Sequence, residues 1–198
     1  MARATYTFRT GSTILQWVLF TGETWYFLPE VFNGFELFIN IALQSRNLTR
    51  PKYSLIGDKA PSVDILITCC GEDVDVIMDT VAAAHDQDYP ADAYRVFVLD
   101  DGYDAQVRAA AEAFNNLPRV KARSAVIYLA RKATVAKPLH FKAGNLRFGI
   151  DESKKRGASE FVAGLDADMI MSRGWLRCVV PHLVLDPGVA MVNPPQVN

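Results

Sequence analysis

A short run of mostly β-branched residues decides the fold of this chain: Val63-Asp64-Ile65-Leu66-Ile67-Thr68-Cys69. Such a run, bounded by Pro61 and Gly71, is typical of a buried β-strand. The apolar residues that follow recur at helical spacing and predict a helix that stops before Tyr89-Pro90: Val74, Ile77, Met78 and Val81. A strand followed directly by a helix indicates the first part of a βαβ unit.

The same alternation continues through the rest of the chain. Further strands are predicted at Tyr94–Leu99, Ala125–Leu129, Phe161–Leu165 and Val189–Val192. Further helices are predicted at Asp104–Asn116, Leu139–Ile150 and Trp175–Leu185, the last weakened or kinked by Pro181. Strands that alternate with helices predict an α/β fold with a Rossmann-like, mostly parallel sheet flanked by helices.

Polar residues occupy the carboxyl ends of three predicted strands, where open parallel sheets bind their ligands. These ends read Thr68-Cys69-Cys70-Gly71-Glu72, Asp100-Asp101-Gly102 and Asp166-Ala167-Asp168. Carboxylates at one edge repel each other unless a cation or hydrogen bonds offset their charge. The spacing of Asp166 and Asp168 suits Mg²⁺ or Mn²⁺, which prefer oxygen ligands and share them with substrate phosphates. Cys69 and Cys70 are interpreted as small apolar residues that close the buried strand.

Each motif also has a structural interpretation. The Asp100-Asp101-Gly102 run suits an ordinary turn as well as a binding loop, and Gly102 permits a sharp turn close to a ligand. Lys142 and Asn145, near the start of a predicted helix, suit a diphosphate or simply a solvated helix face. Glu72 can hydrogen-bond a sugar or base, or stabilise a helix N-terminus.

Composition excludes several classes of function. The 198 residues suit one domain with an appendage, and half of them are hydrophobic. A net charge of -1 argues against a nucleic-acid partner. Three cysteines without metal-ligand spacing fit a reducing compartment: Cys69, Cys70 and Cys178. No nucleophile elbow and no glycine-rich fingerprint after the first strand are present, which argues against serine hydrolysis and dinucleotide chemistry.

The N-terminal part, residues 1–45, is different in kind. From Ile14 to Leu43 it is apolar and aromatic, but acidic residues and Pro29 interrupt it, and the two cleaner pieces are too short to span a bilayer. The pattern predicts one amphipathic helix or two, and a wide aromatic face favours membrane association over packing on the domain's own core. A polar linker over 46–61 then leads into the α/β domain over 62–198. Its basic residues predict that this domain lies on the cytoplasmic side: Arg46, Arg50, Lys52 and Lys59.

The order of the motifs resembles that of family-2 glycosyltransferases, most closely the cellulose synthase-like branch, including its fungal members. Five motifs carry the resemblance: Val63-Asp64-Ile65 with Thr68, Leu99-Asp100-Asp101-Gly102, Lys142-Ala143-Gly144-Asn145-Leu146, Leu165-Asp166-Ala167-Asp168-Met169 and Pro194-Pro195-Gln196. The likeness covers Pro61 to Asn198. It implies a GT-A fold, a UDP-sugar donor, a Mg²⁺ or Mn²⁺ ion, and transfer of a hexose to a growing glycan with inversion.

The resemblance also implies roles for individual residues. Asp100 and Asp101 match the acids that contact uridine, Lys142 matches a diphosphate-contacting lysine, and Asp166 with Asp168 matches the metal-binding pair. Together with the polar residues at the strand ends and the helix start, these matches give the predicted donor-binding set: Thr68, Glu72, Asp100, Asp101, Lys142, Asn145 and Asp166.

Two features of the family are expected beyond residue 198: the general base and the acceptor-gripping motif. The resemblance therefore implies the donor-binding half of such an enzyme. A non-catalytic module that binds nucleotide-sugar, or assembles with a synthase at the membrane, stays open as an alternative. A nucleotidyltransferase is a weaker one, because Cys69-Cys70-Gly71-Glu72 supplies no glycine- and arginine-rich loop.

Overall fold

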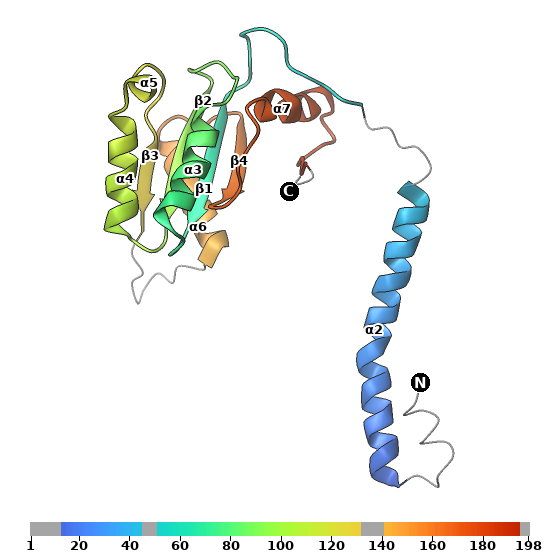
Figure 1. Ribbon diagram of the computed structural model, residues 1–198. Coiled ribbons are helices and arrows are strands. Elements are labelled where there is room, and N and C mark those ends of the chain that lie inside the picture. The colour runs from blue at the N-terminus through green and yellow to red at the C-terminus, as the bar shows by residue number, and fades with distance from the viewer. Residues whose placement is uncertain (1–12, 45–50, 132–140, 195–198) are drawn as a thin grey trace. The chain divides into compact units, whose positions relative to one another are not determined.

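The computed structural model describes residues 13–44, 51–131 and 141–194 (Figure 1). The chain divides into two compact units, Met1–Pro51 and Lys52–Asn198, which are described separately here. Part of the predicted linker and of the last motif lies outside the described ranges: residues 46–50, which include Arg46 and Arg50, and Pro195 with Gln196. Leu139, the predicted start of a helix, also lies outside them.

The described part of the first unit, residues 13–44 and 51, contains one helix, α2 (Ile14–Gln44). The stretch Ile14–Leu43, for which one helix or two were predicted, therefore forms a single helix. Pro29 lies inside it without ending it. The hydroxyls of Thr21 and Thr24 donate to the carbonyls of Trp17 and Phe20 on the preceding turn, which satisfies their polarity within the helix. Within the described ranges, none of the helices combines the length and apolar character that crossing a bilayer requires.

The second unit is an α/β domain with a four-stranded sheet in the order β3-β2-β1-β4. Its strands are β1 (Val63–Cys69), β2 (Tyr94–Asp100), β3 (Ile127–Ala130) and β4 (Phe161–Asp166), and every pairing is parallel. Its helices are α3 (Val74–His85), α4 (Ala105–Asn115), α5 (Pro118–Lys121), α6 (Phe141–Lys155) and α7 (Trp175–Leu185). The predicted fold class is confirmed.

The order of the strands contains one reversal. From β1 to β3 the chain moves across the sheet in one direction, and after α6 it returns to the other side of β1 to add β4. Because parallel crossovers are right-handed, a return in the opposite direction puts its helix on the opposite face of the sheet. The carboxyl ends of β1 and β4 therefore form a topological switch point, the usual ligand position in such sheets.

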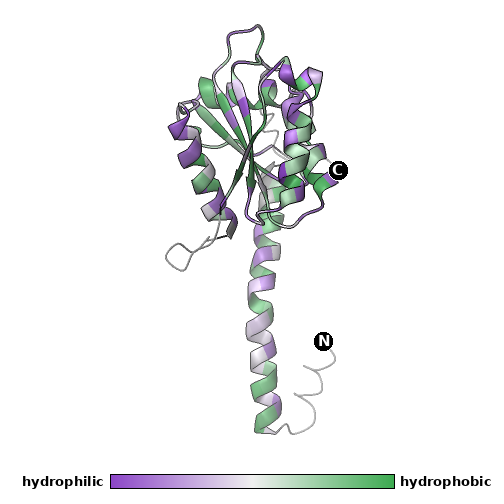
Figure 2. Cartoon of the chain, turned by 90° about the vertical axis from the view of Figure 1, so that its left-hand side faces the viewer, coloured by the Kyte–Doolittle hydropathy of each residue, from purple (hydrophilic) through white to green (hydrophobic). Residues whose placement is uncertain are grey.

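Two hydrophobic layers reflect this arrangement, and Figure 2 shows that the strands between them are mainly hydrophobic. One layer joins alternate residues of β1 and β2 to α3, α4 and α7, while Leu66, Phe97 and Leu99 face α6. Gly149 of α6 is buried against this second layer. A Cβ there would lie 2.4 Å from a methyl carbon of Leu99, so the helix packs closely only because this residue is glycine.

Two local predictions are wrong. Val189–Val192 is not a strand, because the chain turns at Asp186, whose carbonyl accepts from Val189 N, and the following residues pair with no strand of the described sheet. β-branched residues do not form a strand without a partner ladder. Cys70 is exposed and does not close the buried strand, which ends at Cys69.

The amino ends of β1 and β2 are joined by a buried ionic cluster. Asp64 has no exposed surface and accepts two hydrogen bonds from Arg95, at 2.7 and 2.8 Å, and others from Ser153 of α6 and Ser159. Burial opposes the charge, but these hydrogen bonds outweigh it and hold the pKa of Asp64 below its usual range. Asp64 thus belongs to the scaffold, at the opposite end of β1 from the polar strand ends.

We predict that Asp64→Asn lowers the free energy of unfolding by about 3 kcal/mol, because it leaves Arg95 without its buried counter-charge. A depressed folded-state pKa contributes stability above the unfolded value of about 3.9, and this contribution is lost as the pH falls further. Urea unfolding between pH 7 and pH 3 should show the difference between wild type and variant shrinking only below about pH 4. Glu112→Gln, which breaks an exposed pair with Arg108, should change little; a similar loss in both variants would contradict the assignment.

Candidate functional site

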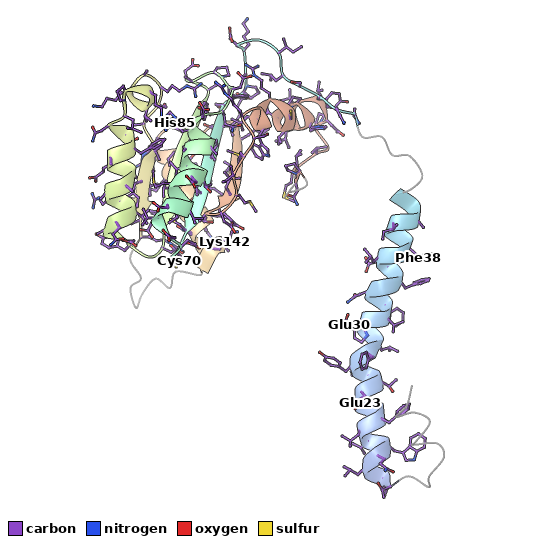
Figure 3. The ribbon with its side chains drawn as sticks, in the orientation of Figure 1. Glu23, Glu30, Phe38, Cys70, His85 and Lys142 are labelled. Atoms are coloured by element: carbon purple, nitrogen blue, oxygen red, sulfur yellow. The ribbon has the colours of Figure 1, made fainter. Side chains whose placement is uncertain are left out.

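The strand pairing brings the predicted site residues to one edge of the sheet. Thr68 pairs with Asp166, and Cys69 pairs with Asp100, so the acids of β2 and β4 lie on either side of β1. Adjacent strands are about 4.8 Å apart, which separates the two acidic strand ends by roughly 10 Å. Figure 3 shows Cys70 and Lys142 at this end of the sheet and His85 at the other.

Asp100 organises the loop after β2. Its side chain is 1% exposed, and its Oδ1 accepts from Gly102 N at 2.7 Å. Its Oδ2 accepts from Asp104 N at 2.7 Å and from the Tyr128 hydroxyl at 2.6 Å. Burial, reinforced by the Asp100 carboxylate, raises the pKa of Tyr128, so this hydroxyl remains a donor. Asp100 thus shapes the loop from inside, as the turn interpretation expects.

The turn in this loop does not rest on glycine flexibility. Gly102 has no left-handed backbone; the positive φ belongs to Tyr103, at 54°. A side chain here would be crowded instead, because a Cβ at position 102 would lie 3.2 Å from Asp100 Oδ1, closer than ordinary van der Waals contact. The same Cβ would lie 3.5 Å from Gly71 N, so the loops after β1 and β2 approach each other here.

Asp101 is held by a cation that the sequence interpretation missed. Arg131, directly after β3, donates Nε and Nη2 to the two carboxylate oxygens of Asp101, a bidentate pair in which both side chains are largely buried. The Asp101 amide donates to Cys69 O at 2.9 Å, which ties the β2 end to the β1 end. The contact could have been inferred from the parallel pairing of β3 with β2, because that pairing places the residue after β3 beside the residue after β2.

The Asp166-Ala167-Asp168 turn carries the second pair of acids. Lys142, in the first turn of α6, forms an ion pair with Asp166, so two residues predicted from separate motifs are in contact. Asp168 is exposed, and within the described ranges no hydrogen bond or ion pair engages its carboxylate. One acid of the pair is neutralised, and the other remains available to a cation.

A buried hydroxyl fixes the backbone of this turn. Thr80 of α3 has no exposed surface and donates to Ala167 O at 2.6 Å, between the two acids. Further along, Gln87 donates to Ser172 O at 2.9 Å and accepts from Leu176 N at 3.3 Å. Buried side chains of α3 and of the residues just after it therefore attach the segment that follows β4, which holds the two acids in a defined place.

Three other predicted residues make internal contacts. Thr68 donates its hydroxyl to Leu165 O at 3.2 Å, and Glu72 accepts from Cys70 N at the start of the next loop. Asn145 is 1% exposed and donates to Leu99 O at 2.8 Å, while its Oδ1 has no hydrogen-bond partner among the residues that the structure describes. Asn145 therefore fixes α6 against the end of β2, three residues from Lys142.

The side chains at this edge fit a divalent cation only if a ligand completes the coordination. Within the described ranges, no group of three or more His, Cys, Asp or Glu side chains could hold a metal ion. Two carboxylates completed by phosphate oxygens and water are nevertheless an ordinary arrangement for Mg²⁺. The thiols do not contribute, because burial and then nearby carboxylates raise the pKa values of Cys69 and Cys70 and keep both protonated.

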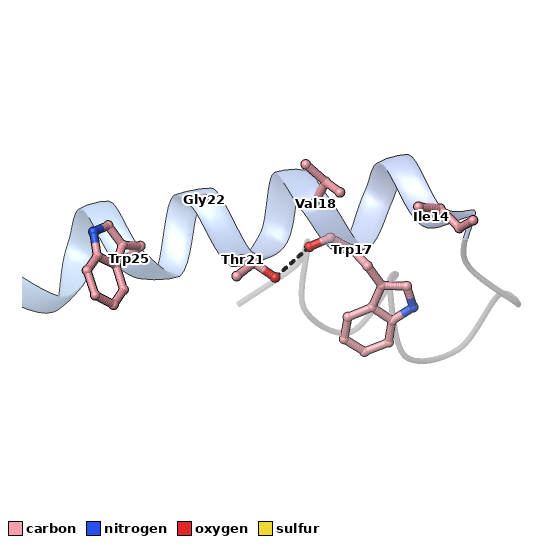
Figure 4. A pocket seen from close by; sticks show the side chains of 6 residues that line it. All are labelled: Ile14, Trp17, Val18, Thr21, Gly22 and Trp25. Carbon is pink, nitrogen blue, oxygen red and sulfur yellow. Dashed lines mark hydrogen bonds between the residues drawn. The ribbon is translucent and has the colours of Figure 1, made fainter.

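A separate apolar hollow lies in the first unit and belongs to α2 alone. It is lined by Ile14, Trp17, Val18, Thr21, Gly22 and Trp25 (Figure 4). Apart from the hydroxyl of Thr21, which bonds to Trp17 O, its side chains offer a hydrophobic surface. This surface has none of the convergent polar groups that bind a nucleotide.

Comparison with known proteins gives a consistent result. The sequence profile described as "Glycosyl transferase family 2" matches residues 64–198. "Putative cellulose synthase 2" of Komagataeibacter xylinus is 31% identical over 150 residues, which cover 75% of this chain and 9% of that protein. "Cellulose synthase catalytic subunit [UDP-forming]" of Pseudomonas fluorescens is 32% identical over 135 residues, which cover 68% of this chain and 16% of that protein. The chain thus spans a small part of these relatives.

Comparison with solved structures shows the type of fold. A matching structure is "Mannosyltransferase PcManGT from Pyrobaculum calidifontis in complex with GDP-Man and Mn2+", with a TM-score of 0.52 and 20% sequence identity. The match covers 72% of this chain and 38% of the mannosyltransferase. The GT-A type of the predicted α/β fold is thereby confirmed.

We predict that Thr80→Val lowers the free energy of unfolding by about 1–3 kcal/mol, because it leaves the buried Ala167 carbonyl without its donor. Thr80→Ser keeps the hydroxyl and should retain more of that stability. Urea unfolding measures the loss, and hydrogen exchange at the Met169 amide, which donates to Asp166 O, reports on the turn itself. Equal stability of the valine and serine variants would show that the contact contributes nothing.

Proposed function

The chain belongs to glycosyl transferase family 2 and is related to cellulose synthases, and we propose that it binds a UDP-sugar together with Mg²⁺ or Mn²⁺ and holds the sugar for inverting transfer to a growing glycan. The contact between Lys142 and Asp166 is the observation that carries this proposal. It brings the lysine for which we propose diphosphate binding to the carboxylate for which we propose metal binding, at the switch point of the sheet. The UDP-forming relatives support the choice of nucleotide.

In this proposal the named residues bind and orient the donor. Asp166 and Asp168 would hold the cation, whose charge offsets the negative charge that develops on the departing UDP. Lys142 lies close enough to Asp166 to donate to diphosphate oxygens at the same place. Asp100, Asp101 and Arg131 fix the loop beside the uridine. The anomeric carbon is then open to attack by an acceptor hydroxyl on the face opposite the diphosphate.

We predict that UDP binds the purified chain more tightly with Mn²⁺ than without it, and that Asp168→Ala weakens the Mn²⁺-dependent affinity at least about tenfold. Isothermal titration calorimetry measures both. Asp151→Ala, which removes an exposed carboxylate of α6, is the matched control and should bind as the wild type does. Binding that is independent of metal and survives Asp168→Ala would refute the metal site.

An assay for UDP release by the purified chain distinguishes a glycosyltransferase from a non-catalytic module that only binds nucleotide-sugar. Release of UDP from a UDP-sugar in the presence of a glycan acceptor identifies a transferase. Tight, metal-dependent binding of UDP without release is the result expected of a nucleotide-sugar-binding module, and equally of a donor-binding half that lacks the general base.

For the first unit we propose association with a membrane surface, with the α/β domain on the cytoplasmic side. Large apolar side chains of α2 are exposed along the helix, among them Trp25 at 77% and Phe32 at 65%. Figure 3 shows Glu23 and Glu30 on the same helix, so it carries acidic as well as apolar residues and suits an interfacial position. Lys52 and Lys59, both exposed, follow it in sequence.

Flotation with phosphatidylcholine vesicles tests this proposal. We expect the wild type to float with the vesicles and the double variant Trp25→Glu with Phe32→Glu to lose at least about tenfold in partitioning, because each substitution removes a large apolar side chain. Glu30→Gln, at an exposed polar position, should float like the wild type. A wild type that stays with the soluble fraction would rule out a membrane-surface role.

A further inference from the structure

The helix α7 lacks one of the hydrogen bonds that an unbroken α-helix has. Pro181 lies inside the helix and has no backbone N–H, so it cannot donate to the carbonyl of Arg177, four residues earlier. A helical carbonyl without its donor needs a partner from elsewhere when water is kept away from it. Pro181 therefore leaves one carbonyl of α7 open to a donor from another segment of the chain.

Part of the predicted linker supplies this donor. The amide of Leu55 donates to Arg177 O at 2.9 Å. The Arg177 guanidinium in turn donates through Nη1 to Leu55 O at 3.0 Å and to Gly57 O at 3.1 Å. Both backbone polar groups of Leu55 are thus bonded to one residue of α7. Figure 1 shows this segment passing α7 on its way to β1.

Side chains of the same segment, Tyr53–Gly57, add to this attachment. The centroid of the Tyr53 ring lies 4.9 Å from that of the His182 ring on α7, and Leu55 packs against the hydrophobic core. The neighbouring Ile56 is 93% exposed, so successive side chains face the protein and water. We call Tyr53–Gly57 the latch segment. A surface segment attached in this way can open without unfolding the domain.

Arg177 connects the latch segment to the residues that follow the cation turn. Its Nε lies 3.2 Å from Asp88 Oδ2, in an ion pair with the loop between α3 and β2. The Asp88 amide donates to Arg173 O at 2.7 Å, in the segment that joins the Asp166-Ala167-Asp168 turn to α7. Gln87, the neighbour of Asp88, holds the same segment through its side chain. Arg177 thus shares with this segment the loop that holds it in place.

We propose that the latch segment opens and closes on α7 as a unit, and that Arg177 is a positioning residue through which the closed latch favours nucleotide binding with metal at the Asp166-Ala167-Asp168 turn. The inference rests on the proposed donor-binding function and adds to it a segment outside the site. Coupling between separate sites requires an element with two states whose equilibrium both sites bias, and the latch segment is such an element. By linkage the effect is mutual, so a nucleotide that binds better to the closed form must also close the latch.

The test combines hydrogen exchange at the Leu55 amide with calorimetry of UDP in the presence of Mn²⁺. Pro181→Ala restores an N–H that can donate to Arg177 O within α7, and so it displaces the Leu55 amide. We expect this variant to exchange the Leu55 amide at least about tenfold faster and to bind UDP about fivefold more weakly. In the wild type, UDP with Mn²⁺ should slow the same exchange by that same factor of about five.

Two further variants complete the test. Arg177→Ala removes the guanidinium contacts and should open the latch by a different route. Arg108→Ala, which breaks an exposed ion pair on α4, is the matched control and should leave both measurements as in the wild type. Thermal unfolding separates positioning from a general loss of stability. Pro181→Ala should melt close to the wild type, because the restored helical hydrogen bond offsets the one that is lost.

Three results would overturn the proposal. If the Leu55 amide exchanges in the wild type as fast as in Pro181→Ala, no latch closes in solution. If Pro181→Ala opens the latch but binds UDP as the wild type does, Arg177 holds the linker without positioning the site, although the proposed function stands. If the wild type binds no UDP with Mn²⁺, the donor assignment fails and the positioning role fails with it, while slow exchange at Leu55 would still show the latch.

Discussion

The parallel pairing of β1 with both of its neighbours is the constraint on which the rest of the structure depends. It sets Thr68 opposite Asp166 and Cys69 opposite Asp100, and thereby collects residues from distant parts of the sequence at one edge. Parallel strands need long crossovers, which supply the helices on both faces. The reversal of direction after β3 then separates α6 from the other helices and places Lys142 beside the end of β4.

Gathering acids at one edge is costly, and the structure offsets their charges in three different ways. Asp100 is surrounded by backbone amides and a tyrosine hydroxyl, so its charge is dispersed through hydrogen bonds inside the loop. Asp101 is neutralised by a buried arginine fork, and Asp166 by an exposed lysine. The first two arrangements are rigid, whereas an exposed ion pair is weak and easily exchanged. The edge is therefore firm near β2 and adaptable near β4.

Much of the fold was predictable from the sequence. Parallel strands that are buried on both faces appear as continuous apolar runs, and the helices show apolar residues at a spacing of three and four. The bounds of β1 were predicted correctly, and those of β2 and β4 within one residue. Val189–Val192 was misassigned, since a strand needs a partner that local composition does not reveal. Arg131 and Thr80 were missed for a related reason: each acts on a group distant in sequence, and only the packed structure shows which one.

The ion pair between Lys142 and Asp166 would also limit how the proposed cation binds. While Lys142 stays on Asp166, a divalent ion would gain full attraction only from Asp168, and an ammonium group nearby would repel it. A diphosphate changes this balance, because it gives Lys142 oxygens of its own and brings further oxygen ligands to the ion. Under the proposed function, cation and nucleotide would then each favour the other's binding, and Lys142 would be the group that exchanges partners. Such coupling is reciprocal by linkage, so an affinity for metal alone would understate the strength of the complete site.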